Sequence, residues 1–120
     1  MLRSIVMAAI LASCASAAQV TPQVRLPESA ELEVYVRQHW EVFSHRVATF
    51  AGRTGESPSM EGFRDADCDH FLSDVIACSF YVTARFEDGQ ARDQWLSTHF
   101  LRDEAGKLKE VWVSVHERRS

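Results

Sequence analysis

Apolar residues change their spacing part-way along the chain, which divides it into a helical half and a strand-forming half. Between Ser29 and Ala51 they recur every three or four positions, as on one face of a helix: Leu32, Val36, Trp40, Phe43, Val47 and Phe50. Ser29 is placed to cap the start of this helix, and Gly52 to end it. The pattern predicts a single helix of about 22 residues, roughly 33 Å long.

After a loop over Arg53–Ser59, rich in Gly, Pro and Ser, the period becomes two. Val75–Phe86 alternates apolar and mixed positions, which is typical of a strand. Asp88-Gly89 then indicates a two-residue hairpin turn that pairs Glu87 with Gln90. A second hairpin is expected at Asp103–Gly106, a three-residue loop with a bulge in which Asp103 pairs with Lys107.

These two turns fix which side chains share a face of the sheet. Val111, Val113 and Val115 are expected opposite His99, Ser97 and Trp95, respectively. One face should then pack on the helix with Ile76, Phe80, Val82, Phe86, Trp95, Leu101, Val111, Val113 and Val115. The opposite face would carry a second apolar set made of Tyr81, Leu96, Phe100, Leu108 and Trp112. A second apolar face is a candidate partner surface unless the segment Arg53–Asp67 or the arm Gln19–Leu26 covers it.

The order of elements predicts an α+β fold with one long N-terminal helix packed on a three- to four-stranded antiparallel meander sheet. In outline this order resembles the cystatin-like and the nuclear-transport-factor-like (NTF2-like) architectures. The Q-x-V-x-G loop of cystatin protease inhibitors does not occur in the chain, and the extra helices of the second group have no counterpart. The resemblance covers element order only, so it assigns no family and no function.

Residues 1–18 have the pattern of an export signal. Arg3 supplies a positive charge, Ile5–Ala12 an apolar stretch, and residues 16–18 a small-residue cleavage site. An alternative interpretation is a lipobox over residues 11–14, in which Cys14 is lipidated. Residues 19–28 are then a linker or an N-terminal arm, and residues 29–120 a single domain. We therefore expect an exported protein, either in a bacterial periplasm or secreted, or lipid-anchored to the envelope through Cys14.

Cleavage after residue 18 leaves two cysteines, Cys68 and Cys78, in an oxidising compartment. We expect them to form a structural disulfide, because their spacing is not the C-x-x-C of redox-active pairs. The chain-entropy model values a closed loop of about eleven residues at roughly 2.8 kcal/mol.

Charge and motifs exclude several classes of function. The formal net charge of −4 gives no basic surface for nucleic acid, and a membrane partner is expected only if Cys14 is lipidated. Asp65–His70 has the spacing of a calcium loop at its start, but His70 stands where that loop requires glycine and Ile76 where it requires glutamate. We therefore predict no metal site and no cofactor, and nucleophile and phosphate-binding motifs are absent.

The leading interpretation is a noncatalytic module that binds another envelope or secreted protein, or a second copy of itself, through the second apolar face. Inhibitors, immunity factors and assembly subunits are of this type. The alternative is a small-ligand carrier or an NTF2-like pocket enzyme, with its site between helix and sheet near Trp40, Trp95 and His99.

Overall fold

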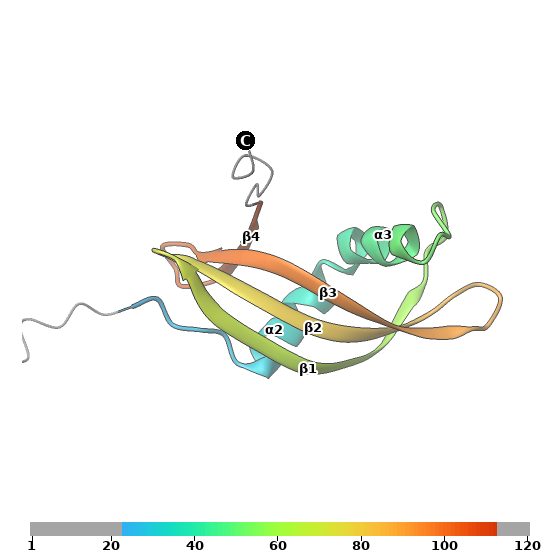
Figure 1. Cartoon of the computed structure of the whole chain (residues 1–120), viewed down its shortest axis with the longest axis horizontal. Coiled ribbons are helices and arrows are strands. Elements are labelled where there is room, and N and C mark those ends of the chain that lie inside the picture. The colour runs from blue at the N-terminus through green and yellow to red at the C-terminus, as the bar shows by residue number, and fades with distance from the viewer. Residues whose placement is uncertain (1–22, 113–120) are drawn as a thin grey trace, which may run out of the picture.

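The computed structural model describes residues 23–112, which form two helices packed on a curled four-stranded antiparallel sheet (Figure 1). The helices α2 (Ser29–Gln38) and α3 (Trp40–Phe50) come first. The strands follow in chain order as β1 (Ser59–Leu72), β2 (Val75–Arg85), β3 (Ala91–Arg102) and β4 (Leu108–Val111). Each strand pairs with the next one along the chain, so the α+β class and the antiparallel meander are confirmed.

The prediction of one long helix is wrong, because the helical segment breaks at His39. This residue has φ −113° and ψ 28°, outside the helical region. Its ring stacks on that of Tyr35 with centroids 4.0 Å apart, and its Nδ1 lies 2.9 Å from the Tyr35 carbonyl oxygen. A new helix starts there, since the amides of Val42 and Phe43 both donate to the His39 carbonyl. The two helices take different directions along one side of the curled sheet (Figure 1).

The apolar stripe itself is confirmed on both helices. Leu32 and Val36 of α2, and Phe43 and Val47 of α3, are fully buried against the sheet, whereas Phe50 at the end of α3 is exposed. Gly52 ends α3 as predicted. Its φ of 74° lets the Arg53 amide reach back to the Ala48 carbonyl.

The first strand lies where a loop was expected. Ser59–Leu72 forms β1, which pairs with β2 along the edge of the sheet, so the expectation that Arg53–Asp67 folds over a sheet face is wrong. The sequence hides this strand because its register shifts three times, between Met60 and Gly62, Arg64 and Asp67, and His70 and Leu72. Each bulge resets the alternation of side chains, so no continuous period of two remains.

The turn between β2 and β3 is one residue longer than predicted. The Phe86 amide donates to the Gln90 carbonyl, and the Gly89 amide to the Phe86 carbonyl, which leaves three residues in the loop. A two-residue type I′ turn needs positive φ at both central residues, Asp88 and Gly89. Among the described residues of this turn only Gly89 has it, with φ 87°. Tyr81 therefore lies opposite Trp95, and Phe80 opposite Leu96.

This shift of one residue exchanges the two faces of β3. Leu96 and Phe100 point toward the helices and are only 4% and 0% exposed. Trp95 and Leu101 alternate with them on the opposite side of the strand, where they had been expected in the core. We call the helix-covered side the inner face and the other side the outer face. The predicted partner face of Tyr81, Leu96, Phe100, Leu108 and Trp112 does not exist as one surface.

The second hairpin has the predicted form. The Asp103 amide donates to the Lys107 carbonyl, and Gly106 closes the loop with φ 82°. His99 lies opposite Val111, as expected, although Val111 is on the outer face together with His99. The pairings predicted for Val113 and Val115 lie outside the described residues.

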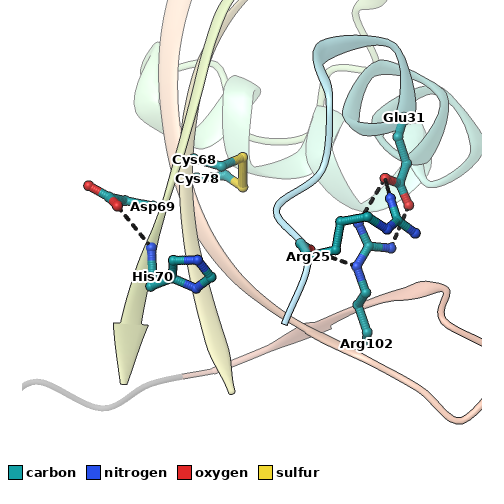
Figure 2. The surroundings of a disulfide bond; sticks show 7 residues. All are labelled: Arg25, Glu31, Cys68, Asp69, His70, Cys78 and Arg102. Atoms are coloured by element: carbon teal, nitrogen blue, oxygen red, sulfur yellow. Dashed lines mark hydrogen bonds and ion pairs between the residues drawn. A yellow bond between two sulfur atoms is a disulfide. The ribbon is translucent and has the colours of Figure 1, made fainter. Parts of the chain in front are cut away.

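The predicted disulfide between Cys68 and Cys78 is confirmed (Figure 2). The two residues are direct partners across β1 and β2, and Cys78 is part of the buried core. The N-terminal arm also packs on this core through Val24 and Leu26, which are partly buried. The predicted signal peptide and Cys14 lie outside the described residues. Within residues 23–112, neither helix is long and apolar enough to cross a bilayer.

Replacing Gly89 by alanine should cost about 1 to 2 kcal/mol in the free energy of unfolding, because a left-handed backbone is strained for an L-residue. A Cβ at Gly89 would meet no atom within 4 Å, so the cost is conformational and not steric. Gly89→Asn should cost less, since asparagine tolerates this region, and Glu87→Ala in the same loop should cost little. Denaturant unfolding measures all three. Equal stability of Gly89→Ala and wild type would contradict the assigned turn.

Removing the disulfide with the double substitution Cys68→Ala and Cys78→Ala should cost about 3 kcal/mol, because the unfolded chain loses its short closed loop. Denaturant unfolding of the variant, compared with wild type with and without reductant, measures this cost. Reduced wild type and the double variant should agree. A variant as stable as the oxidised protein would show that the bond does not stabilise the fold.

Candidate functional site

Within residues 23–112, the outer face of the sheet is a regular surface that the helices leave open. Both helices lie on the inner side (Figure 1), and the buried core residues of β2 and β3 are the ones that point toward them. On the outer face the antiparallel register lines up residues of β1, β2 and β3 in rows that run across the strands. These rows contain the aromatic and charged side chains described next.

One row consists of Arg64, Tyr81 and Trp95. The Arg64 guanidinium lies 4.5 Å from the centroid of the Tyr81 ring, a cation–π contact. Two carboxylates hold this guanidinium, since Asp65 and Asp93 each lie 2.7 Å from one of its nitrogens. The Thr83 hydroxyl donates to the other oxygen of Asp93 at 2.7 Å, and the hydrogen bonds from Thr83 and Arg64 lower the pKa of Asp93. Arg64 is therefore fixed over Tyr81.

Trp95 is the most unusual residue of this row, because 53% of it is exposed. It lies beside Tyr81 near the middle of β3. Tryptophan, tyrosine and arginine are the residue types that contribute most to protein–protein binding energy. A row made of all three is a candidate contact surface.

The next two rows are small and acidic. Asp67, Ser79 and Ser97 form one, and Asp69, Ala77 and His99 form the other. The two aspartates are exposed, and beyond the small side chains the Phe71 ring contacts that of His99 with centroids 5.0 Å apart. We define the outer patch as Arg64, Tyr81, Trp95, Asp67, Asp69, Ser79 and Ser97.

Of the five residues predicted for a partner face, Tyr81 alone belongs to the outer patch. Leu96 and Phe100 are core residues, and Leu108 is half-buried against the core. Trp112 is 84% exposed, and its ring lies 5.0 Å from the Arg46 guanidinium of α3. The prediction missed Trp95 and Arg64. The sequence contained a signal for a three-residue loop between β2 and β3, because glycine is the third loop residue in 87–89 just as it is in 104–106.

The alternative site near Trp40, Trp95 and His99 is not formed. Trp40 is on the helix side, where its indole donates to the Pro58 carbonyl at 2.9 Å, whereas Trp95 and His99 are on the outer face. A pocket of about 370 Å³ lies instead between α2 and the β3–β4 turn, lined by Glu31, Val34, Tyr35, Gln38, His39, Gly106, Lys107 and Leu108. A smaller one of about 190 Å³ lies between α3, the middle of β3 and the end of β4.

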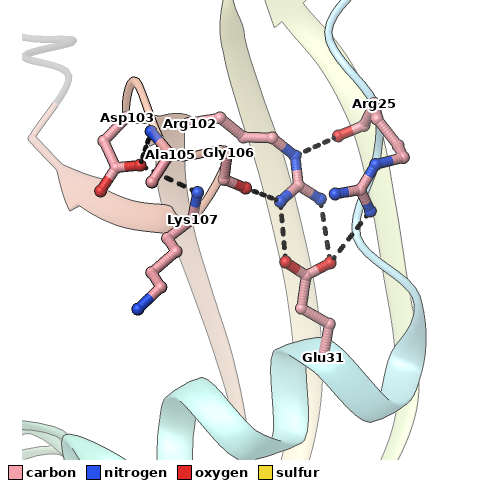
Figure 3. Close-up of polar contacts among 7 residues, drawn as sticks. All are labelled: Arg25, Glu31, Arg102, Asp103, Ala105, Gly106 and Lys107. Atoms are coloured by element: carbon pink, nitrogen blue, oxygen red, sulfur yellow. Dashed lines mark hydrogen bonds and ion pairs between the residues drawn. The ribbon is translucent and has the colours of Figure 1, made fainter.

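Two arginine–carboxylate pairs lie on the inner face, and each connects separate elements of the chain. Arg46 binds Glu110 with two hydrogen bonds of 2.6 and 2.9 Å, and Glu110 also accepts from the Thr98 hydroxyl. Arg102 binds Glu31 with two bonds of 2.7 and 2.9 Å and donates to the carbonyls of Arg25 and Gly106 (Figure 3). The second pair joins the arm, α2 and the second hairpin.

Asp65, Asp67 and Asp69 do not gather into a metal site. All three are exposed on β1, and Asp65 pairs with Arg64. Within residues 23–112, no group of three or more His, Cys, Asp or Glu side chains is arranged to hold a metal ion. No family model matches the chain, and no curated protein or solved structure is detectably similar to it. The outline resemblance to the cystatin-like and NTF2-like folds thus stays a prediction.

The Glu31–Arg102 pair should make stability depend on pH. Hydrogen bonds from Arg102 lower the pKa of Glu31 below its ordinary value of 4.5. The stabilisation is therefore present above that value and is lost as the pH falls through the lowered pKa. Glu31→Gln should cost about 2 kcal/mol at pH 7, because the Arg102 side chain, 7% exposed, loses its charged partner.

Denaturant unfolding at a series of pH values tests this dependence. The gap between wild type and Glu31→Gln should narrow as the pH falls below 4.5. Glu33→Gln is the matched control, since its pair with Arg37 is on the exposed side of the same helix and should contribute only about 0.3 kcal/mol. A gap that does not change with pH would contradict the assignment.

Proposed function

We propose that the protein is an exported, noncatalytic protein-binding module that contacts its partner through the outer patch. The surface differs from the one expected from the sequence, but the type of function is the same. The export signal predicted at residues 1–18 and the disulfide support a role in a periplasm or outside the cell. Another envelope or secreted protein is the proposed partner.

The half-exposed Trp95 beside Tyr81 carries this proposal. A tryptophan loses little conformational entropy on binding, because it has only two side-chain torsion angles for its large contact area. Its neighbours on the inner side of β3, Leu96 and Thr98, are buried, so the strand itself is held firmly by the core. Rigid aromatic anchors on an ordered element are the typical centre of a protein interface. The outer patch thus supports binding better than catalysis.

The pocket of about 370 Å³ supports a second candidate function, the binding of a small ligand. Val34 and Leu108 give it apolar walls, and the stacked rings of Tyr35 and His39 lie between them. The volume is within the range of small-molecule sites. A ligand there would contact α2 and the second hairpin and would leave the outer patch unchanged, so the two candidates are separable by experiment.

Site-specific photo-crosslinking tests the protein-binding proposal. The photoreactive residue p-benzoyl-phenylalanine would replace Ser97, an exposed residue of the outer patch, in the full chain, made with its own N-terminus in a producing cell. This position leaves Trp95 in place. Val34 on α2 is the control position, because it is also exposed but lies on the helix side. We expect one dominant protein adduct from position 97 and none of that mass from position 34.

The adducts decide between the outcomes. An adduct of twice the chain mass would identify a second copy as the partner. The absence of any adduct at position 97, or the same adducts at both positions, would overturn the proposal. The intact mass of the recovered chain would at the same time show whether cleavage occurred after residue 18 or before Cys14.

A further inference from the structure

Arg64 shows how the outer face holds a guanidinium. The flat cation lies over the Tyr81 ring, 4.5 Å from its centroid. Carboxylates of Asp65 and Asp93 contact two of its nitrogens, each at 2.7 Å. This combination of an aromatic ring with flanking carboxylates suits arginine better than lysine, because the guanidinium is planar and more weakly hydrated.

Next to Arg64 the outer face presents another aromatic ring and two more carboxylates. In the part of the chain that the structure describes, no arginine stacks on this ring. Trp95 is the next residue in the row after Tyr81, and half of it is exposed. Asp67 and Asp69 stand on β1 in the two following rows and are exposed on the same face. Within residues 23–112, the ion pairs involve neither of these two aspartates.

The spacing of these groups fits a side chain laid across the sheet. Neighbouring strands are about 4.8 Å apart, so β1 and β3 are separated by roughly 10 Å. Along the strands, Asp67 is one row and Asp69 two rows from Trp95, which adds roughly 7 and 13 Å, so Asp67 is the carboxylate within reach of a guanidinium on the indole. The small side chains of Ser79, Ala77 and Ser97 lie between the aspartates and Trp95. An incoming guanidinium can therefore lie over the indole and reach a carboxylate of β1 without a bulky residue in its path.

We infer that the outer patch recognises arginine side chains of its partner protein, with the guanidinium stacked on Trp95 and paired with Asp67. This inference rests on the proposed function and names the chemistry of the partner. Charge complementarity favours a basic partner over a second copy, since the chain has 17 acidic residues and 13 basic ones. Two copies would bring like net charges together.

Three short peptides provide the probes. Each is an acetylated and amidated Gly-Xaa-Gly-Xaa-Gly in which Xaa is arginine, lysine or citrulline, the uncharged analogue of arginine. They would be titrated into the oxidised, isotope-labelled full chain, with amide and indole shifts followed by NMR. We expect saturable shifts at the Trp95 indole, Tyr81 and Ser97 with the arginine peptide. The lysine peptide should bind at least threefold more weakly, and the citrulline peptide should not saturate.

Two pairs of substitutions with the same change of charge test the carboxylates. Asp67→Asn with Asp69→Asn should raise the Kd of the arginine peptide at least fivefold. Glu87→Gln with Glu104→Gln changes two exposed loop residues and should leave the Kd within twofold of wild type. Trp95→Leu should remove the preference for arginine over lysine, since the stacking surface is lost.

Each result bears on the inference. Equal binding of the citrulline peptide, equal effects of the two double variants, or shifts spread over all acidic residues would overturn it. A position-97 crosslink to a partner, together with any of these results, would overturn the arginine preference and leave the protein-binding function standing. If the peptides bind with selectivity for arginine but no crosslink forms, the protein-binding function is overturned and the arginine preference of the outer patch stands.

Discussion

The conformation of Gly89 determines which residues form the core and which form the outer patch. Because it adopts a left-handed φ of 87°, the loop between β2 and β3 has three residues and Phe86 pairs with Gln90. Successive residues of a strand point to opposite faces, so this pairing fixes which residues of β3 point toward the helices. Leu96, Thr98 and Phe100 enter the core, and Trp95, Ser97 and His99 take the outer face. A turn shorter by one residue would reverse both assignments at once.

The inner face is stabilised by contacts that converge on the helices from several parts of the chain. The core rings pack edge to face, with Tyr35 against Phe100 and Phe43 against Phe80. At one end Arg102 joins the arm to α2 through Glu31, and at the other Arg46 joins α3 to β4 through Glu110. The disulfide fixes β1, the strand with the most irregular register, to β2. All of these contacts lie on the helix side of the sheet or between its strands. They therefore stabilise the sheet without occupying its outer face.

Periodicity predicted those parts of the fold in which a single rule acts over several residues. The helical stripe from Leu32 to Val47 belongs to this group. The second hairpin followed from its turn residues and the disulfide from the number and spacing of the cysteines, which are equally simple rules. The failures have local causes. His39 ends a helix through contacts with Tyr35 that a 3.6-residue period does not register, and bulges such as the one at Asp65, with φ 57°, interrupt the alternation of β1. The break at His39 leaves the helical stripe unchanged, whereas the bulges remove the period of two by which β1 would have been predicted.

The candidate site failed for a different reason, because its assignment depended on one turn. The sequence contained every residue of the outer patch, but Trp95 and Leu96 are neighbours and both are apolar, so composition alone could not choose which of them is exposed. The turn makes the choice, since it places Leu96 opposite Phe80 on the inner face, whereas the indole beside Tyr81 remains half in solvent. Exposure of a large ring costs hydrophobic stabilisation that burial would have supplied. This cost is the physical reason why the exposed Trp95 carries the proposed function.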